Sequence, residues 1–372
     1  MNITIPKSAL LPCLDRANGI ANKKSPVPVV ANVLLRAHAG KLSVIATDLY
    51  MAMSVDIDAT IEEPGVIALP AKDLYERIRA MPDGPIQIRR MVADNGAISA
   101  LVKAVGAARK YTVAGLDATD YPTLPTPEPG ATWQTFPAGA LRHLLDCVQP
   151  AVSLDETRSH INSALLFGDG ERLTAVGTDS HRLTKVRAAV KVTLPDTLVP
   201  LRAVGEIRRL LDKQSGEVDM HVSKTVLFLR LGPLTWSTKT VGEQFPPYKQ
   251  VIPQRFAHTC RVSRAGLIDA LRATQISANE KTGGISLVFT TNKVTARGES
   301  AETGTAEDEV AADYGGPEMT VGFNAKYVLD ALGALDCDEV DLGLNGDLDP
   351  VVIRSVTAPD DFLGVCMPMR TK

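Results

Sequence analysis

Residues 70–81 read PAKDLYERIRAM, residues 200–211 read PLRAVGEIRRLL, and residues 324–335 read NAKYVLDALGAL. The three segments align without gaps, and in each of them apolar residues recur with the spacing of one helix face. A basic residue at the third position is followed four places later by an acidic residue. These pairs are Lys72 with Glu76, Arg202 with Glu206, and Lys326 with Asp330. We therefore expect three amphipathic helices, each with an i, i+4 charge pair on its solvent-facing side.

A second set of related segments predicts one more helix in each repeat. Residues 8–17, 139–148 and 265–274 match one another in their apolar positions. Between the helices, apolar and polar residues alternate, which is typical of two strands joined by a tight turn. Such hairpins are expected within residues 41–57, 171–190 and 293–310, and the first two share a Thr-Asp pair at the turn.

The repeats and two proline-rich stretches divide the sequence into three domains. The repeat period is roughly 120–130 residues. Residues 117–130 and 242–253 have the composition of linkers. We expect domains at residues 1–126, 127–253 and 254–372. Each would hold two helices packed on antiparallel sheets, which is an α+β fold.

The composition is that of a soluble globular protein, with 45% hydrophobic and 22% charged residues among 372. The five cysteines are scattered without a C-x-x-C pair, so neither a disulfide framework nor a zinc site is indicated. The N-terminus lacks the pattern of a signal peptide, and no apolar run is long enough to span a membrane. We expect a cytoplasmic protein with no metal and no cofactor.

Positive charge is concentrated in the expected helices. A net charge of +5 falls within residues 7–21, 71–81, 138–149, 201–213, 263–277 and 324–335, whereas the whole chain carries −3, so the remainder carries −8. One interpretation is that helices simply hold many solvated lysines and arginines. The other is a basic surface that faces a polyanion, on a protein whose acidic exterior discourages indiscriminate binding.

The hairpin of residues 171–190 contains TDSHRL at positions 178–183, which places Asp179, Ser180 and His181 side by side. A hydrolase using these three residues is the alternative hypothesis. It is disfavoured because consecutive residues near a strand end point to alternating faces, whereas a catalytic triad needs side chains that converge. The spacing of metal ligands is also missing around His181. A histidine with a structural role in a turn is the third interpretation.

Four motifs together carry a resemblance that spans the whole chain. They are TDSHRL at residues 178–183, MPMR at 367–370, ATDLYMAM at 46–53 and FPPYKQVIP at 245–253. With the three repeated domains, they resemble the bacterial DNA polymerase III beta subunit family, the sliding clamps. The resemblance implies a head-to-tail homodimer that forms a six-domain ring around duplex DNA, without sequence specificity. It also implies a processivity factor without catalysis, an accessory subunit of a DNA-directed DNA polymerase in DNA replication.

The resemblance further implies a pocket that binds short peptide motifs of the polymerase catalytic subunit, the clamp loader, and other polymerases and repair proteins. The corresponding residues here are Ile161, Thr178, Ser180, His181, Arg182, Leu183, Pro246, Gln250, Val251, Val365, Met367, Pro368, Met369 and Arg370. Two of them depart from the family pattern. Ser180 stands where the family usually has Gly, and Gln250 stands where Arg is common, so the preferred motif is expected to differ.

Two further sets of residues are expected to contact DNA and the second subunit. The candidates for phosphate contact are Lys24, Lys72, Arg77, Arg142, Arg158, Arg202, Arg209, Arg264, Arg272 and Lys326. Near Arg158, Ser159 and His160 replace tyrosines that family members can carry. The candidates for the dimer interface are Tyr111 and Val113 on an edge strand, opposite Ile276 and Ser277. Family members often have a second large apolar residue in place of Ser277.

Overall fold

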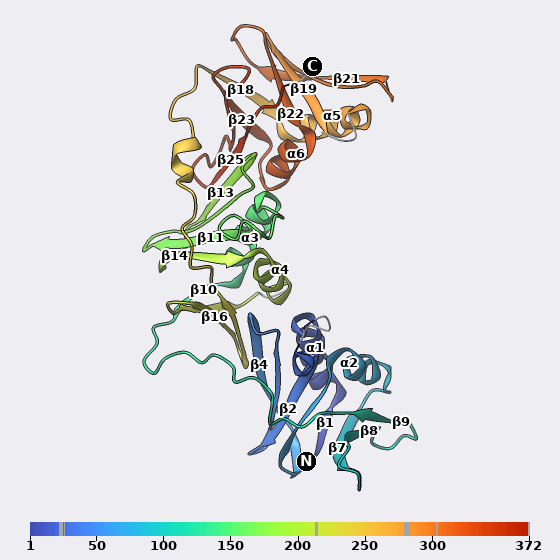
Figure 1. Cartoon of the computed structure of the whole chain (residues 1–372). Helices are drawn as coiled ribbons and strands as arrows, with labels where there is room; N and C mark the ends of the chain where they lie inside the picture. The colour runs from blue at the N-terminus through green and yellow to red at the C-terminus, as the bar shows by residue number, and fades with distance from the viewer. Residues whose placement is uncertain (22–24, 26, 213–214, 279–282, 303, 371–372) are drawn as a thin grey trace. The chain divides into compact units, whose positions relative to one another are not determined.

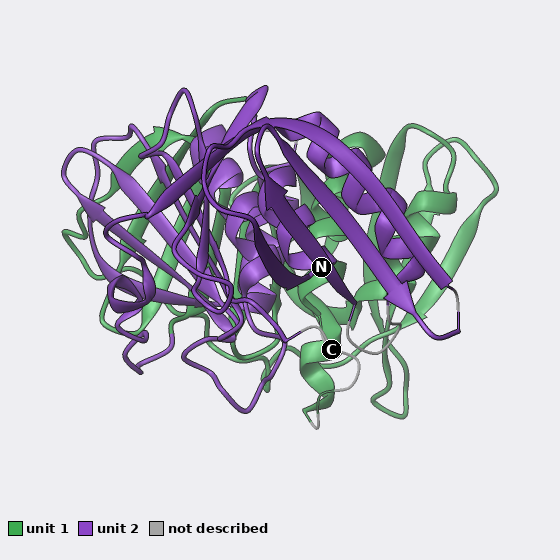
Figure 2. Ribbon diagram, turned by 90° about the horizontal axis from the view of Figure 1, so that it is seen from above, with its two compact units in different colours: residues 1–137, 214–240 green, residues 138–213, 241–372 purple. Residues whose placement is uncertain are grey.

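The computed structural model describes residues 1–21, 25, 27–212, 215–278, 283–302 and 304–370. Its contacts divide the chain into two compact units, coloured separately in Figure 2. Unit 1 comprises residues 1–137 and 214–240, and unit 2 comprises residues 138–213 and 241–372. A segment from the middle of the sequence thus completes unit 1. The three domain boundaries given above remain a prediction beside this division.

The described residues form six α-helices, two for each repeat, as the apolar periodicity predicts. Their bounds are α1 (Lys7–Ile20), α2 (Ala71–Ala80), α3 (Ala138–Val148), α4 (Leu201–Leu210), α5 (Arg264–Thr274) and α6 (Ala325–Gly333). They pack as the pairs α1 with α2, α3 with α4, and α5 with α6 (Figure 1). In α4, Val204, Ile207 and Leu210 are buried, so one face of the helix packs into the core.

The charge pairs expected on two of these helices are confirmed. In α2, Lys72 Nζ lies 3.7 Å from a Glu76 carboxylate oxygen. In α6, Lys326 Nζ lies 2.6 Å from Asp330 Oδ2. In α4, Glu206 accepts hydrogen bonds from Arg209, three residues further on.

Unit 1 contains two antiparallel sheets. The first has the strand order β5-β1-β7-β8-β9, and the second has the order β10-β15-β16-β17-β4-β3-β2-β6. The strands of the first sheet are β1 (Asn2–Pro6), β5 (Thr60–Glu63), β7 (Pro85–Val92), β8 (Ile98–Ala104) and β9 (Lys110–Ala114). Those of the second are β2 (Asn32–His38), β3 (Lys41–Thr47), β4 (Met51–Asp58), β6 (Gly65–Pro70), β10 (Gln134–Pro137), β15 (Glu217–Val222), β16 (Val226–Leu231) and β17 (Leu234–Lys239).

Unit 2 contains one twelve-stranded sheet with the order β14-β11-β12-β13-β25-β24-β23-β18-β21-β20-β19-β22. Its first strands are β11 (Ser163–Asp169), β12 (Leu173–Thr178), β13 (Arg182–Ala188) and β14 (Thr193–Pro200). The others are β18 (His258–Ser263), β19 (Gly284–Thr290), β20 (Lys293–Ser300), β21 (Gly304–Asp313), β22 (Met319–Asn324), β23 (Glu339–Leu344), β24 (Val351–Ser355) and β25 (Phe362–Cys366). The C-terminal strand β25 therefore lies inside the sheet, between β13 and β24.

The three predicted hairpins are confirmed as β3–β4, β12–β13 and β20–β21. The strands that cover the helices bury near-continuous apolar runs, such as residues 173–177 of β12. None of the helices in the described ranges is both long enough and apolar enough to cross a membrane.

Candidate functional site

The turn between β12 and β13 is closed by its own side chains. Asp179 Oδ1 accepts hydrogen bonds from the backbone N–H groups of His181, at 2.9 Å, and Arg182, at 3.0 Å. Thr178 Oγ1 donates to the Arg182 carbonyl oxygen at 2.6 Å. Ser180, at the tip, has a φ of 80°, a left-handed conformation that costs a residue with a side chain about 1 kcal/mol. The Asp and Thr side chains therefore hold a turn shape for which glycine is the least strained residue.

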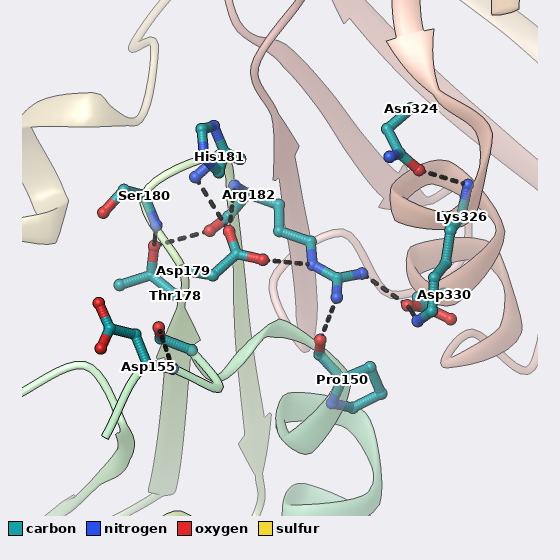
Figure 3. A network of polar contacts seen from close by, with 11 residues as sticks. Pro150, Asp155, Thr178, Asp179, Ser180, His181, Arg182, Asn324, Lys326 and Asp330 are labelled. Carbon is teal, nitrogen blue, oxygen red and sulfur yellow. Dashed lines mark hydrogen bonds and ion pairs between the residues drawn. The ribbon is translucent and has the colours of Figure 1, made fainter. Parts of the chain in front are cut away.

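Arg182 ties this turn to the rest of unit 2 (Figure 3). Its guanidinium is buried, with Nε 3.0 Å from Asp179 Oδ2 and one terminal nitrogen 2.6 Å from Asp330 Oδ2. The other terminal nitrogen donates to the Pro150 carbonyl oxygen. The guanidinium also stacks 4.4 Å from the centroid of the Tyr327 ring. A single side chain thus joins the turn to α6 and to the 3₁₀ turn Gln149–Ala151 that follows α3, and its charge is balanced by two carboxylates.

The hydrolase hypothesis is wrong for this turn. Ser180 Oγ accepts a hydrogen bond from Arg158 at 2.7 Å. The Asp179 carboxylate already accepts hydrogen bonds from backbone N–H groups and from Arg182. The His181 ring stacks on Tyr327 with the centroids 6.4 Å apart. Within the described part of unit 2, no hydrogen bond joins the three side chains into a relay. The nearby Cys366 is no substitute nucleophile, because burial raises the pKa of its thiol to about 12.

The C-terminal segment lies directly against this turn. Strand β25 pairs antiparallel with β13, with Cys366 opposite Arg182 and Val365 opposite Leu183. Beyond the strand, the Met367 N–H donates to the His181 carbonyl oxygen at 2.9 Å. The Met369 N–H donates to the Gly322 carbonyl oxygen at 2.9 Å, which holds this residue against β22. The TDSHRL turn and the C-terminal MPMR segment, both of which were expected to contribute pocket residues, are therefore adjacent.

An apolar cluster forms the base of this region. Its buried members are Leu165, Val176, Leu183, Leu198, Tyr248, Val352 and Val365, with Phe167, Val241, Phe245, Ile252, Phe256 and Leu363 packed at its margin. A hollow of about 590 Å³ lies over the same cluster and is lined by Leu165, Leu198, Tyr248 and residues 243–250. Among the predicted pocket residues, Pro246 and Gln250 line this hollow. We call it the unit 2 groove.

The remaining pocket candidates differ in how much surface they present. Val251 and Met367 are exposed, as is Arg370, whereas Pro368 and Met369 are half-buried. Ile161 is buried, and its carbonyl oxygen accepts a hydrogen bond from the Ser153 N–H. No local sequence pattern indicates Tyr327 and Pro150 as partners of Arg182. Asp330 was recognised only as the partner of Lys326.

The candidate DNA-contacting residues fall into two groups by their internal contacts. Arg142 is bonded to Asp146, Asp212 and the Arg208 carbonyl oxygen, and Arg264 donates to the carbonyl oxygens of Leu332 and Cys337. Arg77 is 4.0 Å from Asp73, Arg209 pairs with Glu206, and Arg158 reaches Ser180. Lys72, Arg202, Arg272 and Lys326 have exposed side chains. Lys24 lies outside the described residues.

The interface candidates lie at an end strand and at the end of a helix. Strand β9 is the last strand of its sheet, with Tyr111 half-buried and Val113 buried on one face. Ile276, in the 3₁₀ turn after α5, is 77% exposed, whereas Ser277 is buried. Tyr111 and Ile276 are thus the two candidates that offer apolar surface to another subunit.

Across the described ranges of the chain, no group of three or more His, Cys, Asp or Glu side chains could hold a metal ion. Two other buried thiols resemble Cys366. Burial raises the pKa of Cys147 and of Cys260 to about 12 in each case. These cysteines pack as small apolar residues.

Comparisons with known proteins cover the chain from end to end. Residues 1–125, 135–247 and 249–370 match the family models for the N-terminal, central and C-terminal domains of the DNA polymerase III beta subunit. The beta sliding clamp of Pseudomonas aeruginosa is 31% identical, and that of Escherichia coli is 28% identical, each over 100% of both chains. A crystal structure of the Pseudomonas aeruginosa DNA polymerase III subunit beta superimposes with a TM-score of 0.92 at 31% identity, over 100% of both chains. A Bartonella birtlesii sliding clamp bound to griselimycin superimposes with a TM-score of 0.90 at 30% identity, again over 100% of both chains.

The network around Asp179 predicts a large difference between two neighbouring substitutions. Asp179→Ala removes a partner of the buried Arg182 and the acceptor of two backbone N–H groups, so we expect a loss of about 2–3 kcal/mol in the free energy of unfolding. Ser180→Gly, the matched control in the same turn, should change it by less than about 1 kcal/mol. Urea denaturation followed by circular dichroism measures both. Equal effects of the two substitutions would show that Asp179 does not hold the turn.

Proposed function

Because this chain belongs to the DNA polymerase III beta subunit family, the bacterial sliding clamps, we propose that its β12–β13 turn and C-terminal segment form a peptide-binding site. The protein is a DNA sliding clamp, a non-catalytic processivity factor that holds the polymerase on duplex DNA. Its partners are duplex DNA, a second copy of the chain, and replication proteins that carry clamp-binding peptides. We place it in the bacterial cytoplasm, where such proteins meet replicating DNA.

One observation carries the peptide-site proposal, namely the pairing of β25 with β13. It places the exposed Met367 next to His181, beside an apolar base that includes Leu183 and Val365. Methionine side chains repack around different partners, while fixed backbone groups at the rim orient an extended peptide. Solved sliding clamps from Pseudomonas aeruginosa and Bartonella birtlesii are bound to griselimycin, which supports a ligand site on proteins of this fold.

Two residues of the site are proposed to alter its preference for peptides. Ser180 adds a side chain at the tip of the turn, and its Oγ is held by Arg158 at 2.7 Å. Gln250 lines the unit 2 groove with an uncharged amide. An acidic residue in a peptide would therefore gain less from position 250 than from the arginine common in the family.

We propose that DNA is held by exposed basic side chains of the helices and not by recognition of bases. Lys72 and Lys326 support this proposal, because each side chain is more than half exposed and its ion pair in the described chain is with a carboxylate four positions along the same helix. Such pairs contribute little stability and can be exchanged for phosphate contacts. Arg142 and Arg264 contribute less to this role, since their donors are already bonded inside unit 2.

The homodimer is proposed to join β9 of one subunit to unit 2 of its partner. An end strand such as β9 leaves backbone groups open for pairing with another chain. Strand β21 offers a second edge, because in the described residues its outer side pairs with β18 only at Ala312 and Asp313. An interface between two different surfaces is head-to-tail, and the ring that it forms is proposed to close after two subunits.

The first test of the proposed function concerns peptide binding. A peptide with a glutamine, a following leucine and a terminal Leu-Phe pair should bind with a micromolar Kd, about −8 kcal/mol. Ending the chain after Cys366 should abolish this binding, because it removes residues 367–370, the C-terminal part of the proposed site. A chain that ends after Arg370 is the matched control and should bind normally. Fluorescence anisotropy measures both, and unchanged affinity in the shorter chain would refute the site.

The second test concerns the assembly. Tyr111→Ala combined with Ile276→Ala removes two apolar anchors, and both junctions of the dimer are affected because each contains the same pair of surfaces. Truncation of buried large residues costs about 2–5 kcal/mol each, so the double variant should sediment as a folded monomer where the parent is a dimer. Lys293→Ala, an exposed substitution on β20, is the control. A parent protein that sediments as a monomer at high micromolar concentration would overturn the dimer.

A further inference from the structure

The turn between β3 and β4 in unit 1 repeats the turn of the proposed peptide site. Asp48 Oδ1 accepts hydrogen bonds from the backbone N–H groups of Tyr50, at 2.9 Å, and Met51, at 2.6 Å, as Asp179 does in unit 2. Thr47 Oγ1 donates to the Met51 carbonyl oxygen at 2.8 Å. Leu49, at the tip, has a φ of 78°, against 80° for Ser180. The backbone conformation of the β12–β13 turn therefore occurs a second time, in the β3–β4 turn of unit 1.

The neighbouring strands repeat in the same register. Strand β17 pairs with β4 as β25 pairs with β13, and the Lys239 N–H donates to the Tyr50 carbonyl oxygen at 2.9 Å, as Met367 does to His181. The corresponding cross-strand pairs are Ala52 with Ser237 and Leu183 with Val365, and then Leu34 with Ile45 and Leu165 with Val176. An isolated bridge joins Ala68 to Leu116 in unit 1 and Leu198 to Val241 in unit 2. Each of these positions in the base of unit 2 thus has a counterpart in unit 1.

The counterparts in unit 1 are smaller. Ala52 stands in the position of Leu183, Ser237 in that of Val365, and Ala68 in that of Leu198. The hollow over this base measures about 760 Å³, against about 590 Å³ in unit 2. The proline-rich segment 117–127 lines the hollow on the side away from this base. Its Tyr121 packs into the apolar cluster around Leu34 and Ile45. We call this hollow the unit 1 groove.

Positive charge surrounds the unit 1 groove. Arg36, Arg90 and Arg230 line it, with Asp117 as the one acidic side chain in its lining. Arg90 is paired with Asp117 at 3.2 Å. Arg230 stacks on the Trp133 ring at 3.7 Å. Neither Arg36 nor Arg230 has a carboxylate within ion-pair distance in the described part of the chain. Each guanidinium group can therefore pair with a carboxylate of a bound ligand.

We propose that the unit 1 groove is a second docking site, which binds an extended acidic peptide of a partner protein through one bulky apolar side chain. The small residues Ala52 and Ser237 leave room for that side chain over the apolar base, and burial of such a group drives docking. Carboxylates on either side of it pair with Arg36 and Arg230, the latter already oriented by Trp133. The site is separate from the unit 2 groove, so it can be occupied whether or not that groove is.

The proposal is tested with the full chain and a labelled probe, Gly-Glu-Glu-Leu-Trp-Glu-Gly. Two double variants change different features of the groove. Ala52→Leu with Ser237→Val fills the base with the side chains of the unit 2 counterparts, and Arg36→Glu with Arg230→Glu reverses the charge of two lining arginines. Each should weaken probe binding at least tenfold, which corresponds to about 1.4 kcal/mol. A probe with lysine in place of glutamate should not bind the parent. A photoreactive phenylalanine at the tryptophan position should cross-link to residues 34–54 or 117–127.

A matched control separates the groove from general charge attraction. Lys293→Glu with Arg297→Glu makes the same change in net charge at two solvent-accessible side chains of β20 in unit 2 and should leave probe affinity unchanged. Equal weakening by this control and by the Arg36 and Arg230 variant would overturn the site, as would cross-links confined to unit 2. Binding within twofold of the parent in both groove variants would also overturn it. The arginine variant keeps the test valid if the filled variant does not fold, because it leaves the buried base untouched.

Discussion

The pairing of β25 with β13 is the interaction on which the proposed peptide site depends. It joins residues about 180 positions apart in the sequence and places the C-terminal methionines beside the TDSHRL turn. Arg182 reinforces this arrangement, because its guanidinium reaches Asp179 in the turn and Asp330 in α6. Loss of either carboxylate would leave this buried charge partly unpaired, which is costly, so the two ion pairs favour one geometry of the turn. The turn is thus held by several polar contacts, whereas Met367 is exposed beside it.

The repeats show how one backbone arrangement supports two different surfaces. In both units an Asp carboxylate accepts hydrogen bonds from backbone N–H groups of the turn and a Thr hydroxyl donates to a backbone carbonyl oxygen, and neither tip residue is a glycine. The two units differ in the volume and charge of the side chains at corresponding positions of their strands. Leu183 and Val365 fill the base in unit 2, whereas Ala52 and Ser237 leave it open in unit 1.

The local parts of this fold could be predicted from the sequence. Apolar periodicity located all six helices of the described chain, and alternation located the hairpins, because both patterns reflect which face is buried. The adjacency of TDSHRL and MPMR came only from the resemblance, since strand pairing between distant segments leaves no local pattern. The Arg182 network was missed for the same reason. The left-handed Ser180 was also missed, because that conformation is usually associated with glycine.

The central claim is that this protein holds DNA by encircling it, and retention on circular DNA tests that claim most directly. The labelled protein would be loaded onto a nicked circular plasmid by a clamp loader with ATP, and the bound fraction would be measured by gel filtration before and after one restriction cut. The account predicts retention on the circle at moderate salt, where phosphate contacts alone are weak, and release once the DNA has ends. Equal retention on the circular and the linear DNA would contradict it.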